Sequence, residues 1–161
     1  MSSETKLPGP PRGISRWLYR APVLLYRLRL GWIFGKRALL LEHTGRVSGR
    51  LRRSVLEVIR ADPAQQIYVV VSGFGAQSDW YRNLLAQPAV QIMIGTSRIP
   101  VEAVILTEDQ AQDELRLYED HHPGMLRFLA VRLLGLRVEA GEEGLQQLMG
   151  LFPVVRFQRR G

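Results

Sequence analysis

The amino-acid sequence predicts an α+β fold, with helices packed on an antiparallel sheet or a small barrel. Short apolar runs follow one another with turns between them, as they do in sequential hairpins. Helical patterns stand first in the chain, once in the middle and again near the end, so strands and helices do not alternate as in a Rossmann domain. A length of 161 residues suits one domain.

The strands are predicted from apolar runs and from alternation with a period of two residues. The stretch 54–60 alternates in the way that a strand does, and the turn 95–97 lies between two apolar runs, which predicts a hairpin. The six predicted strands are 38–43, 54–60, 66–72, 90–94, 98–106 and 152–157.

The helices are predicted from capping residues and from the residues that interrupt them. Ser78 can cap a helix at 79–86, and the sequence TEDQ from Thr107 to Gln110 has the form of a capping box that begins a longer helix. Pro123 and the glycine after it interrupt that helix. Two more helical stretches are predicted at 125–134 and 142–149.

The first 36 residues differ in composition from the rest of the chain. Residues 1–13 are polar and rich in proline and glycine, which predicts a disordered lead. Residues 14–36 place tryptophans and leucines near helical spacing with arginines between them, which predicts an amphipathic helix. This helix either packs on the barrel or a second subunit, or lies on a membrane surface. Residues 37–161 form the main domain.

Positive charge is concentrated in the first part of the chain. The whole sequence has 22 Lys and Arg against 15 Asp and Glu, a formal net charge of +7. Between residues 10 and 60 there are twelve basic residues and two acidic ones. Such a surface suits an anionic partner: a phosphorylated cofactor, a nucleic acid or a lipid headgroup. No zinc-finger, helix-turn-helix or RNP-like motif is present, so we do not expect nucleic acid.

Several classes of protein are excluded by what the sequence lacks. There is no cysteine, which excludes disulfides and thiolate chemistry and favours a cytoplasmic location. The three histidines show no metal-binding spacing, so no metal site is expected. No uncharged apolar run reaches the length of about 18 residues that a membrane span needs.

The turn TGRVSGRLRR, from Thr44 to Arg53, is the first candidate binding site. Its glycines allow a close backbone approach, and arginine offers a planar set of donors for phosphate or carboxylate. The candidate residues are Arg46, Ser48, Arg50 and Arg52. In a strand, Arg50 and Arg52 share one face while Arg53 points to the other. The alternative is an ordinary hairpin whose arginines protect a sheet edge.

The stretch VSGFGAQSDWYRNLL, which begins at Val71, is the second candidate. A strand ends, two glycines loosen the loop, and a helix begins, where free N–H groups attract anions. The candidate residues are Ser72, Gly73, Phe74, Gly75, Ala76, Trp80 and Asn83. The alternative for Trp80 is packing in the core. The stretch matches neither a GxGxxG nor a Walker motif, so it carries no nucleotide fingerprint.

The two stretches together resemble the deazaflavin-dependent nitroreductase family of actinobacteria and related bacteria. The resemblance runs from about residue 39 to 106, through TGRVSGRLRR and YVVVSGFGAQSDWYRNLLAQPAVQIMIG. It implies a split β-barrel of the FMN-binding type, with about six mostly antiparallel strands and flanking helices, over residues 37–161. It also implies that coenzyme F420 binds and passes a hydride to a quinone, a nitroaromatic or another electrophile.

The resemblance assigns roles to several of the candidates. Arg46, Ser48 and Arg52 match the phosphate- and tail-binding turn of the family. The loop residues Ser72, Gly75 and Ala76 match the loop that faces the cofactor ring, and Trp80 and Asn83 match the helix beside it.

Two departures from the family pattern keep other ligands open. Val47 and Gly73 stand where the family usually has lysines, and Arg50 is a possible substitute. An FMN-, haem- or lipid-binding protein without catalysis is therefore the alternative. The family also implies a possible homodimer.

The proton donor is sought on the acidic helix after Thr107. Tyr118 and His121 are the candidates, because a histidine titrates near neutrality and a tyrosine is a tolerable donor. The alternative is that Tyr118 packs on the barrel and His121 only ends the helix.

Overall fold

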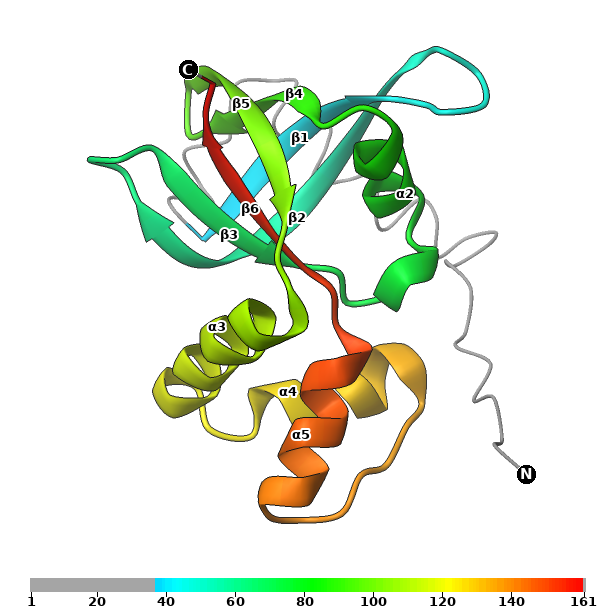
Figure 1. Ribbon diagram of the computed structural model, residues 1–161, viewed down its shortest axis with the longest axis vertical. Helices are drawn as coiled ribbons and strands as arrows, with labels where there is room; N and C mark the ends of the chain where they lie inside the picture. Colours follow the sequence, from blue (N-terminus) through cyan, green and yellow to red (C-terminus); the bar gives the residue numbers. More distant parts are fainter. Residues whose placement is uncertain (1–36, 161) are drawn as a thin grey trace.

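The structure is a computed structural model that describes residues 37–160 (Figure 1). The predicted lead at 1–13 and the predicted helix at 14–36 lie outside the described residues. Six strands close into one antiparallel barrel in the order β1-β2-β3-β6-β5-β4. They are β1 (Ala38–Thr44), β2 (Leu51–Asp62), β3 (Ile67–Val71), β4 (Ala89–Ile94), β5 (Ser97–Ile105) and β6 (Val154–Arg159). The predicted α+β class and the barrel are confirmed.

The helices fall into two groups (Figure 1). The short helices η2 (Gly75–Gln77) and α2 (Asp79–Ala86) follow β3, and α2 lies beside the turn between β1 and β2. The second group gathers at one end of the barrel. It consists of α3 (Glu108–His121), α4 (Met125–Leu129), the π-helical turn η3 (Ala130–Leu134) and α5 (Glu142–Leu151).

Two hydrophobic cores result from the alternation of side chains along the strands. Val70 points into the barrel and packs with Leu39 and Leu41. Its neighbours Val69 and Val71 point outward and pack under the helices of the second group. Each fully buried aliphatic side chain contributes about 1.5–3 kcal/mol to folding, so both cores stabilise the relative placement of strands and helices.

The capping predictions have different outcomes. The capping box is confirmed, because the Gln110 amide donates to Thr107 Oγ1 at 3.4 Å and the Thr107 amide donates to Gln110 Oε1 at 3.1 Å. Ser78 occupies the N-cap position of α2, but its side chain makes no capping bond and instead contacts the Ser72 hydroxyl at 2.7 Å. Among the helices that the structure describes, none is long and apolar enough to cross a membrane.

Candidate functional site

The turn between β1 and β2 is a compact loop closed by its own backbone. The Gly45 amide donates to the Arg50 carbonyl at 2.8 Å, and the Gly49 amide donates to the Gly45 carbonyl at the same distance. Gly49 has a φ of +65°, which favours glycine. A Cβ at Gly45 would lie 2.7 Å from Ser48 Oγ, but this exposed side chain can rotate away, so the contact does not by itself require a glycine there.

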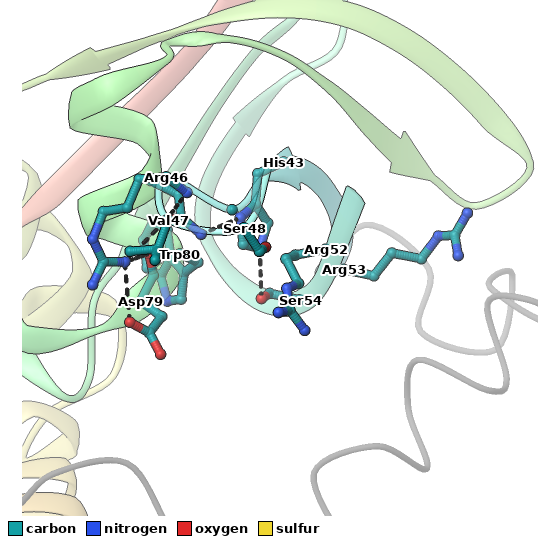
Figure 2. A pocket seen from close by; sticks show the side chains of 11 residues that line it. His43, Arg46, Val47, Ser48, Arg52, Arg53, Ser54, Asp79 and Trp80 are labelled. Atoms are coloured by element: carbon teal, nitrogen blue, oxygen red, sulfur yellow. Dashed lines mark hydrogen bonds and ion pairs between the residues drawn. The ribbon is translucent and has the colours of Figure 1, made fainter. Parts of the chain in front are cut away.

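Arg46 fastens this turn to α2 (Figure 2). Its backbone amide and its Nη1 both donate to Asn83 Oδ1, each at 3.0 Å. Nη1 also pairs with Asp79 Oδ1 at 3.1 Å. Asn83 is buried, whereas the Asp79 side chain is 72% exposed, so the bonds to Asn83 contribute more to the position of the turn.

His43 lies at the centre of the site, although it was not among the residues predicted from the sequence. It is only 4% exposed. Its Nδ1 lies 3.0 Å from Asn83 Nδ2 and its Nε2 lies 3.2 Å from Ser54 Oγ. Burial, and then the charge of Arg52, lower its pKa to about 4, against an opposite effect of Asp79. The imidazole is therefore neutral at neutral pH.

A cavity of about 430 Å³ opens beside these residues. It is lined by residues of β1, the turn, β2 and α2: His43, Gly45, Arg46, Val47, Ser48, Arg52, Arg53, Ser54, Asp79, Trp80 and Asn83. Of the sequence-predicted residues, this arrangement brings together Arg46, Ser48, Arg52, Trp80 and Asn83.

Arg52 and Arg53, near the start of β2, take opposite faces, as the strand pattern predicted. His43 pairs with Arg52 and Glu42 pairs with Arg53 in the β1–β2 ladder. Arg53 Nε bonds the buried Glu42 at 2.9 Å, and Figure 2 shows its side chain pointing away from the residues around His43. Arg52 has no ion pair within residues 37–160, so its guanidinium is available to an anion.

Arg50 and the loop 72–76 do not line the cavity. The Arg50 side chain is exposed, and its amide donates to Ser48 Oγ at 3.3 Å. Ser72 is fully buried and donates to the Gly75 carbonyl at 2.6 Å, so it folds the loop on itself. Gly73 and Phe74 are half-buried and Ala76 is exposed. A contact of this loop with a cofactor ring stays a prediction.

The proposed proton donors also lie elsewhere. Tyr118 is buried and donates to Glu57 Oε1 at 3.1 Å, and burial followed by the Glu57 charge raises its pKa. Glu57 pairs with Ala38 at the end of the β1–β2 ladder remote from the cavity. His121 is exposed, and its Nδ1 donates to the Leu117 carbonyl at 2.7 Å. Their role as proton donors stays a prediction.

Two cavity residues had signals in the sequence that were not used. His43 continues the inward-facing series of Leu39 and Leu41, which places a polar ring at the mouth of a predicted barrel. Asp79 is the first residue of α2, a position where acidic residues are common. Ser54 had no comparable signal, because its importance depends on the contact with His43.

Comparison with known proteins identifies relatives in sequence. Residues 20–127 match a family model described as F420H(2)-dependent quinone reductase. A protein of Mycobacterium tuberculosis (strain ATCC 25618 / H37Rv), named "Putative F420H(2)-dependent quinone reductase Rv3178", is 38% identical over 87 residues. That match covers 52% of this chain and 71% of the relative.

Solved structures of low sequence identity share the fold. An F420-H2 dependent reductase, FDR-A, is 20% identical with a TM-score of 0.51, and the match covers 77% of this chain and 96% of that one. A pyridoxamine 5'-phosphate oxidase-related, FMN-binding protein of Nostoc punctiforme PCC 73102 is 12% identical with a TM-score of 0.50, covering 93% and 83%. These two likenesses support the split-barrel fold.

Proposed function

The chain belongs to the F420H(2)-dependent quinone reductase family, and we propose that its cavity binds coenzyme F420 for the reduction of a quinone. When bound, F420 supplies the hydride, and the protein supplies binding, orientation and a site shielded from water. Quinones are the acceptor class in the family description. Nitroaromatics are the second class to be tested.

The charge of the cavity fits this cofactor, which has a phosphate and an oligoglutamate tail. Three of the lining residues are arginines, of which Arg53 is paired with Glu42, and Asp79 is the one lining carboxylate within the described part of the chain. Asp79 is already paired with Arg46, so it does not cancel the charge of Arg52. The cavity volume of about 430 Å³ lies within the range of small-molecule sites, about 300–1,000 Å³.

The observation that carries the proposal is the unpaired Arg52 beside a turn that is held rigidly against α2. Arg46 uses Nη1 for Asn83 and Asp79, which leaves its Nε and Nη2 without a partner in the described residues. We propose that Arg46 and Arg52 bind the anionic part of F420 with these free donors. Trp80 lines the same cavity and offers an apolar surface to a flat ring.

The Arg52→Ala variant tests the proposal most directly. A charge-assisted hydrogen bond contributes about 1.5–3 kcal/mol, so we expect the Kd for F420 to rise about ten- to a hundredfold. Fluorescence titration of the purified protein with F420 measures this change. Arg159→Ala is the matched control, because it removes the same charge from an exposed position that does not line the cavity. Equal Kd values for wild type and Arg52→Ala would refute this site for F420.

A separate experiment tests a second ligand class. F420 and FMN are added separately, and the melting temperature of the protein is measured with each. A larger increase with FMN would favour an FMN-binding protein, and a porphyrin or fatty acid found by mass spectrometry would favour a carrier. Homodimer formation and contact with a membrane surface stay predictions, to be measured by light scattering and by vesicle sedimentation.

A further inference from the structure

The hydrogen bonds at the cavity form a chain in which each partner determines the direction of the next bond. The chain begins at Arg46, which can only donate. Its amide and its Nη1 both donate to Asn83 Oδ1 at 3.0 Å. The carboxamide oxygen of Asn83 therefore faces Arg46, and Asn83 Nδ2 faces His43 Nδ1 at 3.0 Å.

The orientation of Asn83 determines the tautomer of His43. Because Asn83 Nδ2 is a donor, His43 Nδ1 must accept this bond and carry no hydrogen. A neutral imidazole then has its one N–H at Nε2. That nitrogen faces Ser54 Oγ at 3.2 Å, so His43 donates and the Ser54 oxygen accepts.

The hydrogen of the Ser54 hydroxyl is then left without a partner in the protein. Within residues 37–160 the Ser54 side chain has one hydrogen bond, the one from His43. Ser54 pairs with Leu41 in the ladder and lies on the inward face of the barrel, where it lines the cavity. A ligand in the cavity can therefore accept a hydrogen bond from the Ser54 hydroxyl.

We infer that His43 is a positioning residue that holds the Ser54 hydroxyl as a hydrogen-bond donor toward an oxygen of the bound ligand. This inference deepens the proposed function and rests on it, because the ligand is either F420 or the quinone. Both compounds have carbonyl oxygens, which accept hydrogen bonds and cannot donate them. With the opposite tautomer, Ser54 would donate to His43 and would present its lone pairs to the ligand. The chain of hydrogen bonds from Arg46 to Ser54 thus favours a ligand atom that accepts a hydrogen bond at this point of the cavity.

The tautomer can be measured without any ligand. In protein labelled with ¹⁵N at histidine, we expect His43 Nδ1 to show the shift of a bare nitrogen and Nε2 the shift of a protonated one at pH 7. The signals of His43 are identified as those that disappear in His43→Gln. The reverse assignment, or a hydrogen on both nitrogens, would overturn the proposal that His43 donates to Ser54.

The role of Ser54 is measured with F420 titration and with the KM for menadione as the quinone. We expect Ser54→Ala to weaken one of the two by about fivefold, the usual effect of one neutral hydrogen bond. A change in the Kd of F420 assigns the bond to the cofactor, and a change in the KM alone assigns it to the quinone. No change in either would overturn the proposal.

A double-mutant cycle shows whether His43 acts through Ser54. We expect His43→Leu to cause a loss similar to that of Ser54→Ala, and the double variant to lose no more. His43→Gln offers an amide oxygen and an amide nitrogen, so it should restore most of the loss. A full additional loss in the double variant would contradict a common role.

Two checks separate the possible failures. Melting curves show whether each variant is folded. If His43→Leu does not fold, the ¹⁵N chemical shifts of His43 in the wild type still decide the direction of its bond to Ser54. A wild-type protein that binds no F420 would refute the proposed function, while the same shifts would still decide the direction of the His43–Ser54 bond.

Discussion

Replacement of Asn83 by alanine is the sharpest test of how the site is held together. Asn83 is 4% exposed and takes part in three hydrogen bonds of 3.0 Å: two from Arg46 and one to His43. The bond from the guanidinium contributes about 1.5 kcal/mol and each of the others about 0.5–1 kcal/mol. The variant should therefore lose about 3 kcal/mol of unfolding free energy and about 10 °C in Tm.

The assay is urea denaturation of the protein without ligand, followed by circular dichroism. Arg82→Ala is the matched control, because Arg82 lies exposed on the same helix and does not line the cavity. The control should remain within about 0.5 kcal/mol of wild type. An Asn83→Ala variant that loses no more than the control would show that the turn does not depend on this side chain, and the account of the site would be wrong.

Three further predictions concern other parts of the structure. Because His43 is buried and neutral, the free energy of unfolding should fall by about 3 kcal/mol as the pH decreases from about 6.5 to 4, since in this range the unfolded chain binds a proton at His43 and the folded protein does not. The urea midpoints of His43→Gln should depend less on pH. Tyr118→Phe should lose the bond to Glu57 and about 1 kcal/mol without change in F420 affinity, whereas a slower hydride transfer at unchanged affinity would assign Tyr118 as proton donor. Glu42→Gln should lower the free energy of unfolding, measured by chemical denaturation, by about 1 kcal/mol. The loss is small because water can solvate its two partly exposed arginine partners.

Much of the secondary structure was predictable because its signals are local. The hairpin at 95–97 and the capping box at Thr107 depend on residues within a few positions of each other, and both are confirmed. β6 begins at Val154 and not at 152, because Phe152 is the residue that caps α5 and is buried among the helices. Such boundary errors arise where packing competes with the apolar pattern.

The contacts of Ser78 and Ser72 show where local reasoning failed. A serine before a helix usually bonds a backbone amide of the first turn. In this chain the Ser78 hydroxyl bonds that of Ser72, which is buried and also donates to the Gly75 carbonyl. The loop folded on itself in this way does not line the cavity. A sequence pattern does not reveal which of two partners a hydroxyl will prefer when both are close.

By itself, the sequence determined the strands, the arginine-rich turn and the family, because alternation, turn residues and motifs are properties of neighbouring positions. Only the tertiary structure decided which groups meet. His43 and Asn83 are separated by 40 positions, and Arg46 and Asn83 by 37. They meet because barrel closure and the packing of α2 against the first turn bring distant segments together. The protonation of His43 and the direction of each hydrogen bond follow from these contacts.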